Sequence, residues 1–247
     1  MNLLVDIGNS HIKFAPFDRQ FTNVTTVIYD KKMLRDSLLA NEMASLPVPD
    51  SVVCINVAGK MIENQFVEQC CELWGKTPEF IHVCQYVSGV TNGYKNIDEL
   101  GVDRWMAMIG AWNSIRGNVM VVDIGSAMTI DLVNGDGQHL GGYIVPGDYL
   151  MAKSLLYGTG IKLTPGGNRL SLQPGKTTEE CIANGTARLL TSMIMDIYHS
   201  LNEGQQDIIQ CVITGGGAIN IIEQLSIPVV HQPMLVFDGM RIVKGYT

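Results

Sequence analysis

An internal repeat is the feature of this sequence that most constrains its fold. Residues 3–14 read LLVDIGNSHIKF, and residues 120–131 read MVVDIGSAMTID. In both segments an apolar run ends in Asp-Ile-Gly, a small hydroxyl or amide residue follows, and a second apolar-rich run begins. Asp6 and Asp123 lie about half the chain apart, a period too long for a solenoid of short repeats. The repeat therefore predicts two related halves with a ligand cleft between them.

Each copy of the repeat predicts a β-hairpin, because a tight glycine turn separates two apolar runs. Asn134-Gly135 is a strong turn signal and predicts a third strand near residues 140–145. Apolar spacing predicts further elements, namely strands at 52–57, 80–83 and 211–214 and helices at 61–74, 103–116, 178–201 and from 218. Gly117 is expected as the residue that ends the second helix, and we place the boundary between the halves beside it. These elements predict an α/β fold.

Composition and charge exclude several classes of protein. Apolar residues make up 46% of the chain and charged residues only 17%, against about 25% in an average domain, so the chain is expected to be folded. The net charge is −7 and the longest basic run is Lys31-Lys32, which argues against a nucleic-acid groove. An anionic small ligand is compatible with this charge, because backbone N–H groups can bind phosphate.

Cysteines, histidines and hydropathy point to a cytoplasmic protein without a metal cluster. None of the six cysteines forms a C-x-x-C pair, and they are expected as buried free thiols. The five histidines share no ligand spacing and are interpreted as structural. The N-terminus has no basic segment and Asp6 interrupts its apolar run, so no signal peptide is expected. No apolar stretch reaches the 18 or so residues of a membrane span.

The first candidate site is the turn from Asp6 to Ser10. Glycine allows close approach of the backbone to a phosphate, Asn and Ser add donors, and an aspartate at a strand end can hold hydrated Mg²⁺. The same residue types are also usual in an ordinary hairpin turn. The second copy at Asp123-Ile124-Gly125-Ser126 favours the nucleotide interpretation.

Two further motifs carry candidate chemistry. Gly215-Gly216-Gly217 lies between a predicted strand and helix, so an adenine or ribose could lie flat against its backbone, although it does not match G-x-G-x-x-G. Gly101-Val102-Asp103-Arg104 opens a predicted helix, whose N-terminus stabilises the charge of Asp103 while Arg104 offers a fork for a carboxylate. The alternative for this second motif is a helix cap with a solvated arginine.

Five motifs in order resemble those of type III pantothenate kinases. They are DxGN[ST] at 6–10, GxDR at 101–104, DxG[ST]AxT at 123–129, GGxIxPG at 141–147 and TGGGA at 214–218. The resemblance implies the acetate and sugar kinase, Hsp70 and actin superfamily, with duplicated RNase H-like halves, 1–117 and 118–247, around a nucleotide cleft. Ser10 and Ser126 stand where threonine is frequent, which keeps the hydroxyl. Residues 25–41 match no feature of the family.

The resemblance implies transfer of the ATP γ-phosphoryl group to the terminal hydroxyl of pantothenate, giving 4'-phosphopantothenate, the first step towards coenzyme A. Asp103 would be the general base and would mainly orient the hydroxyl, because phosphoryl transfer has a loose transition state. Gly101, Val102 and Arg104 would contact pantothenate, with a carboxylate or another oxygen as the target of Arg104. Tyr94 matches a pantothenate-contacting tyrosine of a subset of the family; its alternative is a half-buried tyrosine with a wet hydroxyl.

A homodimer is also implied, because the residue that Thr178 matches reaches the substrate from the neighbouring subunit in this family. Thr178 is in addition a good N-cap for the predicted long helix. The implied ATP contacts are Asp6, Gly8, Asn9, Ser10, Lys13, Ser126, Gly215 and Gly216. Mg²⁺ would lie near Asp6 through water, and Asp123 matches a monovalent-cation position for potassium or ammonium. Lys13 has the alternative of a solvated strand lysine.

Two other functions were weighed against the kinase. A nucleotide-binding regulator could keep the fold without catalysis, but it would have no need of the Asp103–Arg104 pair. An RNase H-like nuclease would need clustered carboxylates for two metal ions and a basic surface, which the net charge of −7 disfavours. The sequence therefore favours a pantothenate kinase.

Overall fold

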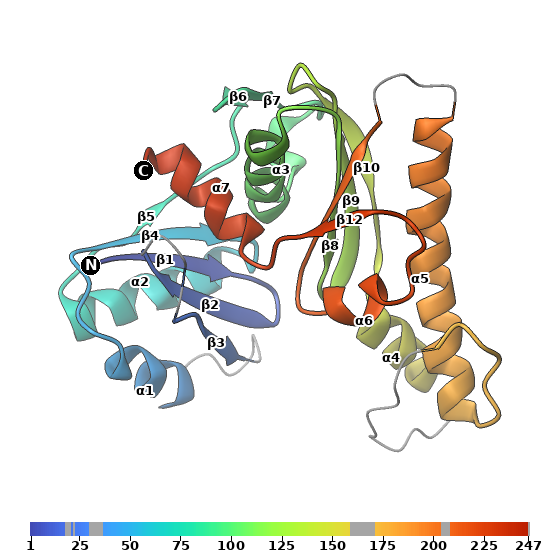
Figure 1. Ribbon diagram of the computed structural model, residues 1–247. Helices are drawn as coiled ribbons and strands as arrows, with labels where there is room; N and C mark the ends of the chain where they lie inside the picture. The colour runs from blue at the N-terminus through green and yellow to red at the C-terminus, as the bar shows by residue number, and fades with distance from the viewer. Residues whose placement is uncertain (18–20, 22, 30–36, 159–170, 204–207, 247) are drawn as a thin grey trace. The chain divides into compact units, whose positions relative to one another are not determined.

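The computed structural model describes residues 1–17, 21, 23–29, 37–158, 171–203 and 208–246 (Figure 1). Two compact units divide the chain. The first unit comprises Met1–Val87, Lys95–Gly110 and Val236–Thr247, and the second comprises Ser88–Tyr94 and Ala111–Leu235. The units are defined by contacts between residues, whereas the boundary beside Gly117 was placed between two duplicated halves of the sequence. That boundary therefore stays a prediction. Residues 30–36, within the unmatched segment 25–41, lie outside the described part of the chain.

A five-stranded sheet forms the centre of the first unit. Its strands are β1 (Asn2–Ile7), β2 (His11–Pro16), β3 (Thr25–Ile28), β4 (Ser51–Asn56) and β5 (Glu79–Phe80). They lie in the order β3-β2-β1-β4-β5, with β2 antiparallel to β1 and β3, and with β4 parallel to β1 and β5. The predicted strand at 80–83 is wrong in its extent, because only Glu79 and Phe80 pair with β4.

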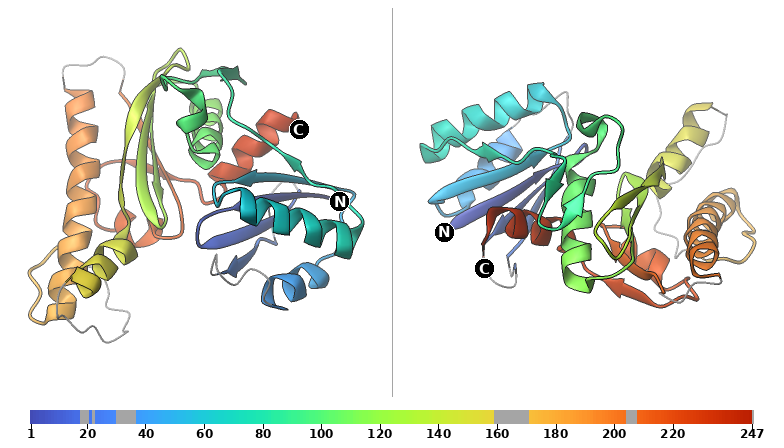
Figure 2. Two further views of the ribbon diagram at one scale, coloured as in Figure 1. Left: turned by 180° about the vertical axis from the view of Figure 1, so that it is seen from behind. Right: turned by 90° about the horizontal axis from the view of Figure 1, so that it is seen from above.

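Helices cover both faces of this sheet (Figure 2). The helix α1 (Ser37–Ser45), which the sequence did not predict, and α2 (Lys60–Trp74) share a core with alternate residues of β1. The spacing expected for α2 is confirmed, since its buried residues are Ile62, Phe66, Cys70 and Trp74. On the opposite face lies α7 (Leu235–Lys244), which belongs to the same unit (Figures 1 and 2).

The second unit repeats the arrangement of the first. Its strands are β8 (Val119–Ile124), β9 (Ala127–Val133), β10 (His139–Pro146), β11 (Gln210–Thr214) and β12 (Val229–His231). They lie in the order β10-β9-β8-β11-β12, with the same pattern of parallel and antiparallel neighbours. The duplication expected from the repeated Asp-Ile-Gly is thereby confirmed.

Three helices accompany the second sheet. They are α4 (Asp148–Gly158), α5 (Thr178–Asn202) and α6 (Ala218–Ile222). The long helix α5 runs along one face of the sheet (Figure 1), where Leu190 and Ile194 share a core with Met120 and Ile213. Thr177 caps this helix through a capping box with Glu180. The expectation that Thr178 is the N-cap is therefore wrong; Thr178 is the first helical residue.

The helix α3 (Val102–Ile115) begins in the first unit and ends in the second. It follows the short 3₁₀ helix η1 (Ile97–Glu99) and the small hairpin of β6 (Tyr86–Val87) and β7 (Val90–Thr91). Most of its residues are buried, which agrees with a helix that is apolar all round. At its end Arg116 has a φ of 55° and its side chain lies over the Trp112 ring. Arg116, rather than the expected Gly117, has the left-handed conformation that ends the helix.

The structure also describes the state of the cysteines and the character of the helices. All six cysteines are free thiols, and the expectation that they are buried is wrong for Cys71 and Cys181, which are exposed. Among the described residues, no helix has both the length and the apolar character required to cross a membrane.

Candidate active site

The first candidate phosphate-binding turn joins β1 to β2. The Gly8 N–H donates to the carbonyl of His11 at 2.9 Å, and a Cβ on Gly8 would lie 3.1 Å from that oxygen. Asp6 lies opposite Lys13 in the antiparallel register, so the two side chains share one face of the sheet. That face is opposite to the core shared with α1 and α2, which contains Val5 and its alternate neighbours. The expectation that strand alternation places Lys13 on the same face as the aspartate turn agrees with this register, and its role in ATP binding stays a prediction.

Tyr29, which sequence reasoning missed, supports the same turn. Its hydroxyl donates to the carbonyl of Gly8 at 2.5 Å, and its backbone N–H donates to the carbonyl of Ser10 at 3.2 Å. Burial, and secondly the charge of Asp6, raise the pKa of Tyr29 to about 12. The hydroxyl is therefore a protonated donor at neutral pH. No local signal in the sequence marks Tyr29, because it meets the turn only through pairing of β3 with β2.

The second candidate turn joins β8 to β9 and is one residue shorter than the first. The Gly125 N–H donates to the carbonyl of Ala127, two residues further along the chain, at 2.9 Å. In the first turn the Gly8 N–H donates to the carbonyl of His11, which is three residues further along. Asp123 lies opposite Thr129, so Thr129 takes the place that Lys13 has in the first hairpin. The two copies thus share the aspartate and the glycine but differ in the residue across the hairpin.

Two glycine motifs pack against this second turn. The Gly147 N–H donates to the carbonyl of Ser126 at 2.9 Å, and a Cβ on Gly147 would lie 2.3 Å from the carbonyl oxygen of Gly125. Gly215 has a φ of +96°, and its Cβ would lie 2.4 Å from both Asp123 Oδ1 and the carbonyl oxygen of Ile124. Three motifs that are far apart in the sequence therefore meet around Asp123. A Cβ on Gly216, by contrast, would meet no atom within 4 Å.

The GxDR motif lies at the start of α3 in the first unit. The Arg104 N–H donates to Asp103 Oδ1 at 2.8 Å, and the Trp105 N–H donates to the carbonyl of Gly101 at 3.0 Å. A Cβ on Gly101 would lie 2.6 Å from Asp103 Oδ1, so glycine is required for this carboxylate position. Val102 and Arg104 are buried, and Arg104 is only 6% exposed. The alternative of a solvated arginine is therefore wrong.

Tyr94 and Thr178 both belong to the second unit. Tyr94 is half-buried, and its ring is stacked on that of His139. Thr178 is exposed at the first turn of α5. The remaining predicted contacts, Asn9 and Ser10, lie in the first turn, where Asn9 is exposed. The roles of all these residues in binding stay predictions.

The oxygen atoms around Asp123 fit a hard cation. Asp123 Oδ1 and the Ile124 carbonyl oxygen lie close together, each 2.4 Å from the position that a Cβ on Gly215 would take, and carboxylate and carbonyl oxygens are the ligands that such cations prefer. Asp6 offers a single carboxylate, which suits an Mg²⁺ ion that keeps most of its water. The described residues contain no group of three or more His, Cys, Asp or Glu side chains arranged for a metal ion.

The duplicated sheets, each with an aspartate and a glycine turn after its first strand, define the class of actin-like ATPase folds. An archaeal actin homologue aligns with a TM-score of 0.51 at 12% identity, covering 100% of this chain and 99% of that one. A Campylobacter jejuni chain assigned to the Baf family of transcriptional activators aligns with a TM-score of 0.63 at 23% identity, covering 98% of each chain. Likeness at this level of identity shows the fold alone.

Sequence comparison narrows the class to a family. The family model for type III pantothenate kinase matches residues 2–200. A type III pantothenate kinase of Alcanivorax borkumensis is 31% identical over 247 residues, which cover 99% of each chain. The protein belongs to the type III pantothenate kinase family.

Proposed function

We infer that this protein transfers the γ-phosphoryl group of ATP to the terminal hydroxyl of pantothenate, the first step towards coenzyme A. Membership of the family supports this activity. The observation that carries it is the intact GxDR motif, in which Gly101 leaves space for Asp103 and Arg104 is buried beside it. Nothing in the fold or the comparisons favours an inactive regulator.

Asp103 is proposed as the group that accepts the proton of the pantothenate hydroxyl. The Arg104 N–H fixes Oδ1, so the orientation of the carboxylate is set by the first turn of α3. Because phosphoryl transfer has a loose transition state, the main contribution of such a carboxylate is to orient the attacking oxygen.

Five further residues are proposed to bind pantothenate, namely Tyr94, Gly101, Val102, Arg104 and Thr178. The guanidinium of Arg104 can form a bidentate pair with a carboxylate or bind another oxygen. Its burial supports this role, because a buried guanidinium gains more from an anionic partner than a solvated one does.

The residues proposed to bind ATP come from three glycine turns and, for Lys13, from the strand β2. They are Asp6, Gly8, Asn9, Ser10, Lys13, Ser126, Gly215 and Gly216. Backbone N–H groups of such turns bind phosphate without a net positive charge, so the charge of −7 does not oppose ATP binding. Mg²⁺, proposed near Asp6 through water, would neutralise charge on the phosphates. The open space beside Gly216 supports its place against the adenosine.

Asp123 is proposed to hold a monovalent cation, potassium or ammonium, with the Ile124 carbonyl oxygen. The support is that Asp123 Oδ1 and the Ile124 carbonyl oxygen lie close together beside Gly215. Rates measured in potassium and in sodium-only buffer test this proposal. Equal rates in the two buffers would contradict it.

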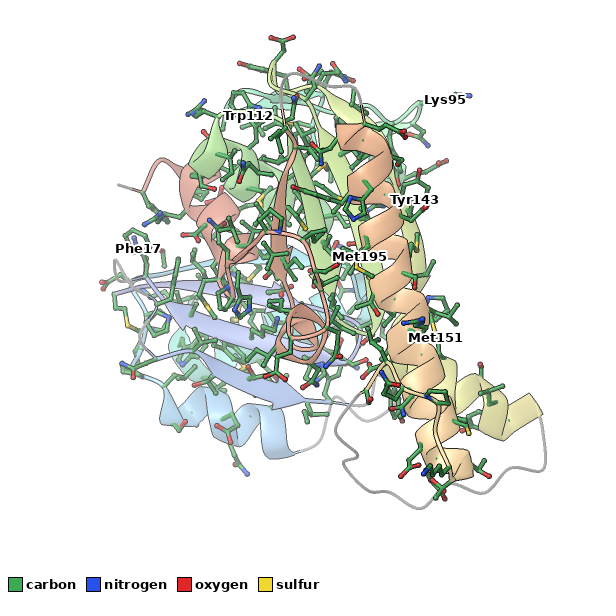
Figure 3. All side chains as sticks on the ribbon, turned by 45° about the vertical axis from the view of Figure 1, so that its right-hand side comes forward. Phe17, Lys95, Trp112, Tyr143, Met151 and Met195 are labelled. Atoms are coloured by element: carbon green, nitrogen blue, oxygen red, sulfur yellow. The ribbon has the colours of Figure 1, made fainter. Side chains whose placement is uncertain are left out.

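A homodimer in the cytoplasm is proposed as the working form. The second unit carries exposed apolar side chains, which we define together as its apolar surface, namely Tyr143 on β10, Tyr149, Leu150 and Tyr157 on α4, and Leu189 on α5, each at least 40% exposed. Tyr143, labelled in Figure 3, lies opposite Ile130, which belongs to the core shared with α5, and α4 contacts both α5 and β10. Exposed apolar patches of this kind mark protein interfaces, and a second copy of this chain is the proposed partner.

A coupled assay of ADP release tests the proposed function. We expect ADP release that depends on pantothenate and is absent with other small hydroxy acids. Asp103→Asn should lower kcat by about 100-fold to 10,000-fold while nucleotide binding and thermal unfolding stay unchanged, because a general base contributes that much. Asp98→Asn, on the exposed turn η1, is the matched control and should keep its activity. Near wild-type turnover in Asp103→Asn would contradict the assignment of the base.

A further inference from the structure

A buried Asp–His pair in the second unit is left without a role by the proposed chemistry. His139 Nε2 on β10 lies 3.1 Å from Asp131 Oδ1 on β9, and the two side chains are 0% and 2% exposed. Since the carboxylate can only accept, Nε2 carries the proton and donates it. His139 Nδ1 is buried too and has no hydrogen-bond partner among the residues that the structure describes.

This pair is not explained by stability. A buried carboxylate loses its hydration, and a buried ring nitrogen without a partner adds a further penalty. Apolar residues of similar volume would avoid both penalties. Local violations of this kind are typical of functional sites, so a role beyond packing is indicated.

The imidazole of this pair stacks with the ring of Tyr94. The rings of Tyr94 and His139 are nearly parallel, at 16°, with centroids 5.7 Å apart. Asp131 and Thr129 alternate on β9 and so share one face of the sheet, and Thr129 lies opposite Asp123 on β8. Asp131 therefore lies on the sheet face that also carries Asp123.

The backbone that leads to Tyr94 is also fixed to the β9–β10 hairpin. The Thr91 N–H donates to the Gly137 carbonyl at 2.8 Å. Gly93 approaches the carbonyl oxygen of His139 so closely that a Cβ would lie 2.0 Å from it, and a Cβ on Gly137 would lie 1.9 Å from the Gly89 carbonyl oxygen. These contacts fix the backbone before Tyr94. The orientation of the Tyr94 ring is then set by its stacking on the His139 ring.

We propose that His139, held by Asp131, is a positioning residue that orients Tyr94 for the binding of pantothenate. This proposal rests on the proposed function, and on Tyr94 as a pantothenate contact within it. The Asp131 carboxylate fixes the tautomer and the plane of the imidazole, and the imidazole fixes the plane of the Tyr94 ring. A tyrosine held in its binding orientation loses less conformational entropy when the substrate arrives, so the pair acts on affinity rather than on phosphoryl transfer.

The test separates pantothenate affinity from turnover. His139→Gln keeps an N–H for Asp131 but removes the ring under Tyr94. We expect the KM for pantothenate to rise about fivefold or more while kcat and the KM for ATP change by less than about twofold, as for the loss of uniform substrate binding. His231→Gln, on the opposite edge strand β12 of the same sheet and exposed, is the matched control and should change neither KM. An unchanged KM for pantothenate in His139→Gln would overturn the proposal.

A double-variant cycle distinguishes positioning from a general structural effect. If His139 acts through Tyr94, then Tyr94→Ala and Tyr94→Ala/His139→Gln should have the same KM for pantothenate. The same fold-rise from His139→Gln in both backgrounds would overturn the proposal. Asp131→Asn is the second variant, to be used if His139→Gln does not fold, because asparagine keeps an acceptor for His139 Nε2. We expect it to raise the KM for pantothenate by less than His139→Gln does, and to have no effect on this KM in the Tyr94→Ala background.

Calorimetric binding of pantothenate to the full chain, with a non-hydrolysable ATP analogue present, gives a readout that needs no turnover. We expect the Kd for pantothenate to rise with KM in His139→Gln. A wild-type protein that neither binds nor phosphorylates pantothenate would overturn the proposed function and this proposal together. A wild-type protein that does both, with a Kd unaffected by His139→Gln, would overturn the positioning role alone.

Discussion

At the scale of single residues, neighbouring glycines in the TGGGA motif serve different purposes. Gly215 needs its positive φ, and a Cβ there would meet Asp123 Oδ1 and the Ile124 carbonyl oxygen at 2.4 Å. Gly215→Ala should therefore lower the free energy of unfolding by more than about 1 kcal/mol, because alanine fits neither the conformation nor the space. Thermal or urea unfolding measures this change.

Gly216→Ala is the matched variant, since a Cβ at this position would meet no protein atom within 4 Å. Its unfolding should be unchanged, whereas its KM for ATP should rise if the adenosine lies against Gly216. If Gly216→Ala left the KM for ATP unchanged, the proposed adenosine contact would be wrong. Equal stability of Gly215→Ala and wild type would contradict the steric interpretation of Gly215.

Tyr29 gives a prediction on pH dependence. Its pKa is about 12 in the folded protein and near 10 in the unfolded chain, so the folded state binds this proton more tightly. The contribution of Tyr29 to the free energy of unfolding is constant below about pH 10 and decreases as pH rises towards 12. Tyr29→Phe should be less stable at pH 8, through the lost hydrogen bond to Gly8, and should show a weaker decrease in stability between pH 10 and 11. Urea unfolding of both proteins across this range is the measurement, and parallel pH profiles would contradict the prediction.

Residue identities indicate candidate site residues only where a motif is local. The sequence indicated both aspartate turns, the glycine run and the GxDR motif, and the structure places Gly215 against Asp123 and Gly147 against Ser126 in the second unit. It did not indicate Tyr29 or His139, because each contacts a residue that is distant in the sequence. His139 was interpreted as structural because the histidines share no ligand spacing; its packing against Tyr94 follows from the fold of the segment 88–94 onto β10.

At the scale of elements, the close packing of α7 on α3 depends on one glycine. A Cβ on Gly239 would lie 2.0 Å from the carbonyl oxygen of Met106, which is main-chain and cannot move aside alone. Gly239→Ala should lower the free energy of unfolding by about 1–3 kcal/mol, as overpacking does. Gly117→Ala is the control: its φ is not in the left-handed range and its Cβ would meet only the Ile115 side chain, at 3.7 Å. This control should be neutral or slightly stabilising. Destabilisation by Gly117→Ala alone would contradict both assignments.

The boundaries of elements were less predictable than their existence. The amphipathic helix α2 and the strands after the repeat were predicted, because long-range packing agrees there with the local pattern. The observed ends of helices differ from the predicted ones where two neighbouring residues could each take the capping position. Thr177 rather than Thr178 caps α5, because its side chain and Glu180 complete a capping box. Arg116 rather than Gly117 ends α3, and its guanidinium over Trp112 stabilises a conformation unusual for arginine.

At the scale of the whole molecule, the repeat predicted the shared topology but not the way the chain is distributed between the units. Both sheets have the same strand order, as a duplication requires. The units are nevertheless discontinuous, because α7 returns to the first unit and the segment 88–94 joins the second. Such returns depend on contacts of Gly239 and Tyr94 with distant residues, which a repeat pattern does not encode.

The proposed homodimer yields the prediction that belongs to this scale. Leu189 on α5 is 64% exposed within the apolar surface of the second unit, and a charge there would have to be desolvated in an interface. Leu189→Arg should therefore convert a dimer into a monomer, as measured by light scattering during size-exclusion chromatography. The control is Ile28→Arg on β3, which is 69% exposed on the edge strand of the first sheet and should leave the dimer intact. If Thr178 reaches the substrate of the neighbouring subunit, the monomeric variant should also show a raised KM for pantothenate. A monomeric wild type, or a Leu189→Arg protein that stays dimeric, would contradict this interface.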